Sequence, residues 1–199
     1  MRKGFWLIAP FATWMALMAA LPATATAYAV RTAVVALLLL CACCFKGPRS
    51  SFLTSGWESA SPLLGGILVG LAVFVIWILP EQFDIPLYRR FCIIGEGGTQ
   101  AVAEASEAMI AVRLVGSAFV ISVAEELFFR KWLIGFAGFW PMVALFAVEH
   151  DRWLVGAIAG VAYGWLYLRK GLGAAIIAHA TTNLVLGLWV IRSGQWQFW

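Results

Sequence analysis

Long apolar runs separated by short polar stretches make up most of this chain. The runs cover residues 5–21, 32–45, 62–79, 108–124 with a continuation to about 133, 142–150, 153–168 and 172–191. A helix that crosses a membrane needs about 20 apolar residues at a rise of about 1.5 Å per residue. The pattern therefore predicts an all-α fold, a polytopic transmembrane helical bundle with about seven membrane segments.

The first two runs each allow two interpretations. Two basic residues, an apolar stretch and a run of small residues resemble a cleavable signal peptide over residues 1–27. The apolar stretch is longer than is usual for such a peptide and contains Pro10 and two tryptophans, which favours a retained first helix. The second run is short for a crossing unless its helix begins near Tyr28 and includes Arg31, whose long side chain can reach the interface.

Composition supports a membrane protein built as one domain. The 199 residues are 63% hydrophobic and only 12% charged, whereas a soluble domain carries about 25% charged residues. We expect a single membrane domain over 1–199, with N-terminal helices over 1–80, a polar loop over 81–107 and a C-terminal core over 108–192. The polar loop is interpreted either as a solvated connector or as a lid over a substrate entrance.

The net charge of +4 is better explained by orientation in a membrane than by binding to a nucleic acid. The basic residues stand at the ends of apolar runs, where they orient a protein in the lipid bilayer. No basic patch interleaved with aromatic residues occurs, so no nucleic-acid partner is expected. The slight excess of basic residues at alternate boundaries favours an N-terminus on the cytoplasmic side.

A first polar motif, Glu125-Glu126-Leu-Phe-Phe-Arg130, interrupts the apolar pattern of the core. Ionisable groups at membrane depth are costly and indicate a functional site. Adjacent residues on a helix point about 100° apart, so the two glutamates have different surroundings. Glu126 and Arg130 have the spacing of a helical ion pair, which leaves Glu125 to face a cavity and take a proton from water. An ordinary ion pair at a solvated helix end is the alternative.

Two further motifs contain both histidines of the chain. Phe146 and His150 share one helix face, where the aromatic ring can form an apolar wall and the histidine can hold or polarise a water. His179 and Asn183 share a face of the last helix and can donate two hydrogen bonds to one oxygen, as an oxyanion hole does. Packing or helix-pairing roles for these polar residues are the alternatives.

The three motifs are expected at a similar depth in the membrane. Counted from the nearest polar boundary, Glu125, His150 and His179 lie roughly 9–13 Å deep at about 1.5 Å per residue. The helix over 153–168 is then too long to return from that depth without strong tilt. An earlier start of the preceding helix, near Leu133, would relieve this conflict.

In this order and within apolar helices, EExxxR, FxxxH and HxxxN resemble the CPBP family, the CAAX prenyl protease and bacteriocin-processing (Abi) intramembrane proteases. The resemblance makes 108–192 a catalytic core. The stretches 149–153 and 178–183 also resemble the subgroup found beside exosortase and PEP-CTERM sorting systems. The resemblance implies an intramembrane endopeptidase of the bacterial inner (cytoplasmic) membrane that hydrolyses a peptide bond of a membrane-associated protein or peptide.

The resemblance also implies a role for each motif. Glu125 and His150 would activate the attacking water, and His179 and Asn183 would stabilise the oxyanion. The remaining members of the catalytic set, which would support these groups, are Glu126, Arg130 and Phe146.

A metal ion is an open question at this stage. Zinc is possible, with Glu125, His150 and His179 as ligands and an open fourth position. The mechanism implied by the family resemblance instead uses a glutamate-activated water without metal, and we favour that version.

Two other classes of function compete with a protease. A non-catalytic scaffold or immunity protein of the same type would bind a partner through the polar cavity. A small proton-coupled carrier would also bury glutamate, arginine and histidine, although the inverted repeats typical of carriers are not visible in the sequence.

Overall fold

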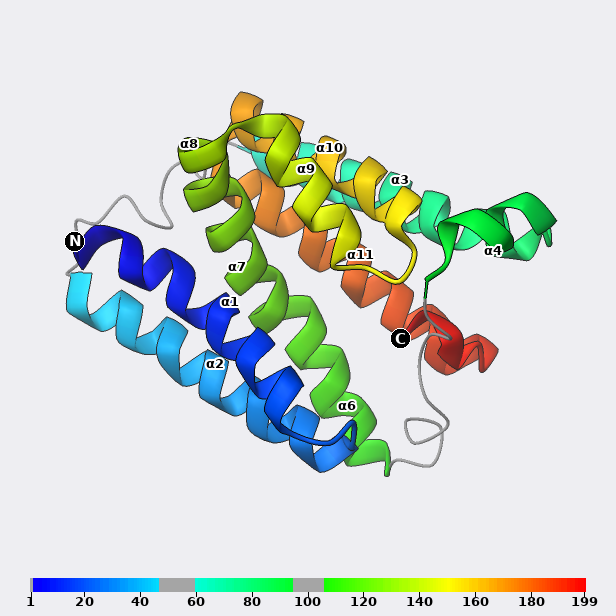
Figure 1. The fold of residues 1–199 in the computed structure, drawn as a ribbon, viewed down its shortest axis with the longest axis horizontal. Helices are drawn as coiled ribbons and strands as arrows, with labels where there is room; N and C mark the ends of the chain where they lie inside the picture. The colour runs from blue at the N-terminus through cyan, green and yellow to red at the C-terminus, as the bar shows by residue number, and fades with distance from the viewer. Residues whose placement is uncertain (1, 47–59, 95–105) are drawn as a thin grey trace.

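The computed structural model describes residues 2–46, 60–94 and 106–199, which form helices joined by short turns, without a strand among them (Figure 1). The predicted all-α membrane bundle is confirmed. Four stretches are long and apolar enough to cross a membrane: Ala25–Cys44, Pro62–Gln82, Glu107–Ala137 and Leu172–Ser193. The elements are α1 (Arg2–Ala20), α2 (Ala25–Lys46), α3 (Ala60–Gln82), α4 (Pro86–Cys92), α6 (Glu107–Val115), η1 (Gly116–Ile121), α7 (Ser122–Glu126), η2 (Leu127–Leu133), α8 (Ile134–Ala137), α9 (Phe139–Val148), α10 (Trp153–Lys170), α11 (Leu172–Ser193) and η3 (Trp196–Phe198).

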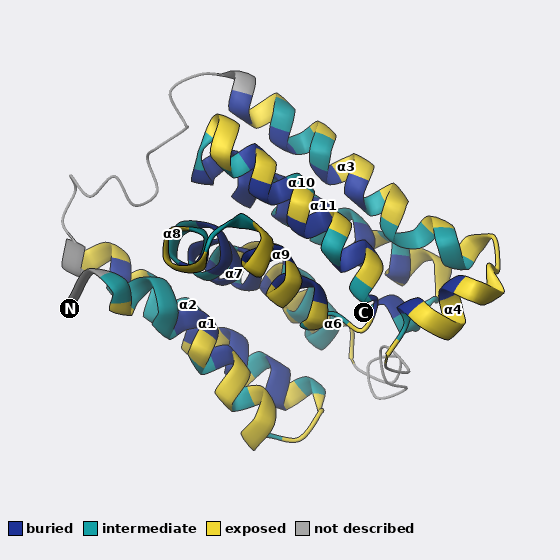
Figure 2. Cartoon of the chain, turned by 45° about the horizontal axis from the view of Figure 1, so that its top comes forward, coloured by how far each residue is buried: buried dark blue, intermediate teal, exposed yellow. Residues whose placement is uncertain are grey.

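One long helix passes through the middle of the molecule. It runs from α6 to α8, and η1 and η2 are wider π-helical turns within it. Helices α1 and α2 lie on one side of it, and α3, α10 and α11 lie on the other (Figures 1 and 2). The first motif, on α7 and η2, is therefore at the centre of the bundle.

The first helix packs tightly into this bundle. The Phe11 ring lies 4.7 Å from that of Phe128 and 5.1 Å from that of Phe129, measured between centroids. Trp14 meets Tyr28 of α2 edge to face at 5.4 Å. Helix α1 thus lies where a retained membrane helix would, and N-terminal sequencing tests whether residues 1–27 are kept.

The second helix begins well before its apolar run, at Ala25, and so includes Arg31. The interpretation in which this helix begins before its apolar run and includes Arg31 is confirmed. Outward faces of α2 and α3 are strongly apolar: Leu40 is 63% exposed and Leu64 is 61% exposed. Figure 2 shows such exposed positions along the outer sides of these helices, where hydrocarbon chains would cover them.

Glycines bring α3 and α11 into close contact. A Cβ atom on Gly70 would overlap the carbonyl oxygen of Ala178 and stand 2.7 Å from Cβ of Thr181. The Gly70 carbonyl also lies 2.8 Å from the Thr182 hydroxyl. Small residues let membrane helices approach in this way, so this contact fixes the face of α11 that carries the third motif.

Replacing Gly70 with alanine is therefore expected to destabilise the bundle. Overpacking of this kind costs about 1–3 kcal/mol, because the added methyl group pushes α3 away from α11. Thermal unfolding of the purified protein in detergent micelles measures the loss. Gly65→Ala is the matched control, since no neighbouring atom of the described residues lies within 4 Å of a Cβ at that position. Equal melting temperatures for the two variants would contradict the close contact.

Helix α9 begins at Phe139, directly after Gly138, whose φ of 95° ends the preceding helix. The suggested start near Leu133 is wrong, because the central helix continues to Ala137. A Cβ atom on Gly164 of α10 would stand 2.8 Å from the Phe139 ring. The end of α10, over 165–170, therefore extends beyond the start of α9, which resolves the length conflict without an earlier start.

The polar segment over 81–107 contains a helix where the structure describes it. Helix α4 begins with Pro86, a residue whose fixed φ suits the first helical position, and it buries Tyr88 and Cys92. The Trp153 indole donates to the carbonyl of Phe91 at 2.8 Å. This part of the segment thus packs against the start of α10, while Glu96 and the rest of 95–105 lie outside the described residues.

Candidate active site

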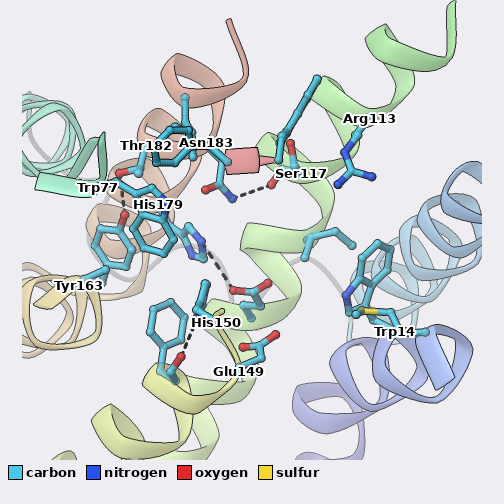
Figure 3. Close-up of a pocket in the computed structure, with 18 of the residues that line it drawn as sticks. Trp14, Trp77, Arg113, Ser117, Glu149, His150, Tyr163, His179, Thr182 and Asn183 are labelled. Carbon is cyan, nitrogen blue, oxygen red and sulfur yellow. Dashed lines mark hydrogen bonds and ion pairs between the residues drawn. The ribbon is translucent and has the colours of Figure 1, made fainter. Parts of the chain in front are cut away.

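The side chains of the three motifs meet at a cavity of about 280 Å³ inside the bundle (Figure 3). It lies between the central helix, α10 and α11, with Trp14 of α1 and Tyr28 of α2 on its other side. Five predicted site residues line it: Glu125, Phe146, His150, His179 and Asn183. Glu126 and Arg130 do not line the cavity and are completely buried behind it. The sequence prediction that one site unites these motifs agrees with this placement.

The predicted ion pair of the first motif is confirmed. Arg130 Nη1 lies 3.1 Å from Glu126 Oε1, and neither side chain is exposed. The guanidinium also stands over the rings of Phe146 and Tyr163, at 4.1 Å and 5.4 Å from their centroids. A charged pair buried this deeply holds its geometry only when both partners remain, so it forms a fixed base for the cavity.

His179 joins the two glutamates. Its Nδ1 lies 2.8 Å from Glu126 Oε1, and its Nε2 lies 3.6 Å from Glu125 Oε2. The imidazole stacks on Tyr163 with ring centroids 5.0 Å apart. The carboxylate of Glu126 can only accept, so Nδ1 carries a proton and the ring is held in one orientation. Glu125 Oε2 is buried and finds no hydrogen-bond partner within the part of the chain that the structure describes, which leaves it available to a water.

His150 is fixed by the end of its own helix. The backbone N–H of His150 donates to Ala147 O and not to Phe146 O. The imidazole Nδ1 instead forms a hydrogen bond of 2.7 Å with the Phe146 carbonyl oxygen. A carbonyl only accepts, so Nδ1–H is the donor and the neutral ring keeps a lone pair on Nε2. The FxxxH spacing is thereby explained as a cap on an orphan carbonyl of the last turn. Gly156 of α10 allows this, since a Cβ there would stand 3.2 Å from His150 Cβ.

Asn183 makes a different contact from the one expected with His179. Its amide nitrogen donates to the backbone oxygen of Ser117 at 3.0 Å. That oxygen lies in the π-helical turn η1 and also accepts from Ser122 at 3.2 Å. π-Helical turns are frequent at functional sites. The donors of His179 and Asn183 thus go to different acceptors here, and a shared oxyanion stays a prediction.

Sequence reasoning missed several residues of this site. Glu149 lines the cavity, and its carboxylate is close enough to Glu125 for the two to repel each other when ionised. Tyr163 donates to the Thr182 hydroxyl at 2.6 Å and carries the stack under His179. Glu149 had a usable signal, because an ionisable residue next to His150 ends an apolar helix. Tyr163 had none, since aromatic residues occur throughout the chain.

The described residues do not fit a metal centre. Nowhere in 2–46, 60–94 or 106–199 do three His, Cys, Asp or Glu side chains come together as a ligand set. Glu125, His150 and His179 face one cavity, and the contacts at Nδ1 of both histidines leave Nε2 as the available nitrogen, but the three side chains do not come together as a ligand set. We therefore derive no step through a metal ion.

Comparison with known protein families gives one match, in the C-terminal half of the chain. Residues 107–185 match the family model described as type II CAAX prenyl endopeptidase Rce1-like. The resemblance to CPBP proteases is thereby confirmed over the helices that carry all three motifs, whereas the exosortase-associated subgroup stays a prediction. No curated protein and no solved structure matches the chain.

Proposed function

We propose, on the premise that residues 107–185 carry a type II CAAX prenyl endopeptidase Rce1-like domain, that this chain is an intramembrane endopeptidase. Its substrate would be a membrane-associated protein or peptide, and its site of action the bacterial inner membrane. The observation that carries the proposal is the position of His179 between two glutamates at the wall of a cavity. That cavity has a volume of about 280 Å³, and the peptide bond to be cleaved would enter it.

The attacking water would be activated by Glu125 and His150. Both side chains line the cavity, and each keeps an acceptor that the described residues do not use: Oε2 of Glu125 and Nε2 of His150. Glu125 takes a proton as the water oxygen bonds to the scissile carbonyl carbon. The same proton then passes to the leaving nitrogen as the C–N bond breaks, in general acid–base catalysis.

The negative charge on the carbonyl oxygen would be stabilised by His179, with Asn183 as the second donor. Glu125 and Glu126 both flank the His179 ring, and a second proton on that ring would make Nε2 a donor. With that proton, the charges of Glu125, Glu126, Arg130 and His179 sum to zero. Nε2–H then points toward the cavity and donates to the oxyanion, and the second amide hydrogen of Asn183 is free of the Ser117 contact.

A cleavage assay with a defined probe tests the proposal. The purified chain in phosphatidylcholine nanodiscs is incubated with a farnesylated peptide ending in a CAAX sequence, in ¹⁸O-labelled water with a chelator present. We expect one ¹⁸O atom in the new carboxylate and the same rate without chelator, because the water attacks directly and no metal takes part. A rate lost with chelator and restored by zinc would contradict the metal-free mechanism.

A second readout covers substrates other than the farnesylated probe. Membranes from cells that produce the chain and from cells that lack it are compared by mass spectrometry of protein termini. New termini should occur only when the chain is present. If neither the probe nor any membrane protein is cut, the protease proposal fails, and partner capture by the intact cavity would point to the scaffold.

A further inference from the structure

A second cavity, of about 530 Å³, adjoins the catalytic one. The two cavities share lining residues, among them Trp77, Glu149 and His150, so a molecule bound at the catalytic groups can extend into the second space. Three arginines line this second cavity: Arg152, which is paired with Glu81, and two others, Arg31 from α2 and Arg113 from α6. Figure 3 shows Arg113 beside the catalytic cavity, on the opposite side from His179.

Neither Arg31 nor Arg113 is paired with a carboxylate among the described residues. Arg130 has Glu126 and Arg152 has Glu81 as ion-pair partners, whereas no described acidic side chain forms an ion pair with Arg31 or Arg113. Acidic residues do line the second cavity, namely Glu149 and Asp151. Both Nε atoms are buried and find no hydrogen-bond acceptor among residues 2–46, 60–94 and 106–199, and an unpaired charge shielded from water is costly.

Aromatic rings hold the two guanidinium groups in place without using their N–H donors. Arg31 stands over Trp14 at 5.4 Å, and Arg113 stands over Tyr28 at 4.7 Å and over Trp199 at 5.5 Å. Cation–π contacts of this kind engage the flat face of the guanidinium. The edge of the group, which carries the donors, stays available.

The fold also forces the two positive charges together. The Tyr28 ring contacts both guanidinium groups, which are close enough to repel each other. Helix α2 is pressed against η1 at Gly116, where a Cβ atom would stand 2.9 Å from the Thr32 side chain. Repulsion between two neighbouring cations, of which Arg31 is buried and Arg113 half-buried, is relieved by an anion placed between them, so this arrangement has the character of an anion site.

We propose that Arg31 and Arg113 form a subsite that binds a carboxylate of the peptide substrate. The inference rests on the proposed protease function, because the continuity of the two cavities makes the bound peptide the occupant. Guanidinium groups bind carboxylates through paired N–H donors. The carboxylate comes either from the C-terminus of the peptide or from an acidic side chain near the scissile bond.

Peptide binding to the Glu125→Gln protein in neutral phosphatidylcholine nanodiscs tests the subsite without any cleavage. The probes are a short apolar peptide with a free C-terminus, the same peptide amidated, and an amidated peptide with one aspartate. One of the two carboxylate peptides should bind roughly tenfold more tightly than the amidated apolar peptide, as expected for charge-assisted hydrogen bonds. The better of the two identifies the source of the carboxylate.

Arg31→Gln and Arg113→Gln should each remove this preference. Arg169→Gln is the matched control, because Arg169 is exposed and stands over Trp165 at 5.7 Å in a similar cation–π contact. If all three peptides bind equally to the protein in which both arginines are present, the proposal is overturned. This outcome does not depend on whether an arginine variant folds. A preference that disappears when phosphatidylglycerol is added would assign the subsite to a lipid and would also overturn it. Carboxylate-dependent binding with no cleavage by the wild-type chain would refute the protease and leave the subsite standing.

Discussion

Glu125→Gln is expected to reduce kcat for peptide cleavage by roughly 10³-fold, within the range that a general base contributes. Glutamine has the same shape but cannot accept a proton from water at neutral pH. The fold should be unaffected, because Glu125 Oε2 makes no hydrogen bond with the described residues. Loss of its charge also removes the repulsion from Glu126 and Glu149, so the melting temperature should stay equal or rise.

The measurement compares steady-state cleavage by wild type and variant in the same nanodiscs, with thermal unfolding recorded on the same samples. Glu107→Gln is the control, since Glu107 lies on the same long helix but is exposed at its beginning. That variant should retain full activity. Cleavage by Glu125→Gln at the wild-type rate would remove Glu125 from the mechanism and direct attention to Glu149 as the base.

The membrane segments were predictable because their physical cause is local. A hydrocarbon layer demands a continuous apolar run of fixed length, and each such run lies in a helix, although α2 begins seven residues before its run. Helix α4 was not predicted, because polar residues over 81–94 satisfy no such pattern and its helix depends on packing of Tyr88 against α10. A break between about 133 and 142 was predicted, but its position at Gly138 was not, because a positive φ leaves no mark in the apolar pattern beyond one glycine.

The candidate site was predictable wherever its residues are four apart on one helix. That spacing places Glu126 beside Arg130 and His150 beside the Phe146 carbonyl. Contacts between helices had no such signal. The hydrogen bond from His179 to Glu126 joins residues 53 apart in the sequence. Ser117 offers its carbonyl to Asn183 only because the helix widens there into a π-helical turn, a change that no apolar pattern records.

The buried pair behind the cavity gives the second large expected effect. Glu126→Ala should lower the free energy of unfolding by about 3–5 kcal/mol, the usual result of removing one partner of a buried ion pair. Arg130 would remain completely buried with its charge unpaired. His179 would lose the acceptor of its Nδ1–H at the same time, so activity should fall as well.

A double variant separates the two consequences. Glu126→Leu/Arg130→Met replaces the pair by apolar side chains of similar volume, which is often neutral or stabilising. Unfolding in detergent micelles should therefore show stability close to wild type, while cleavage stays low because His179 is no longer oriented. Stability lost to the same degree in the single and double variants would mean that the Glu126 carboxylate stabilises the bundle through His179 rather than through Arg130. Full activity in the double variant would show that His179 keeps its orientation by stacking on Tyr163 alone.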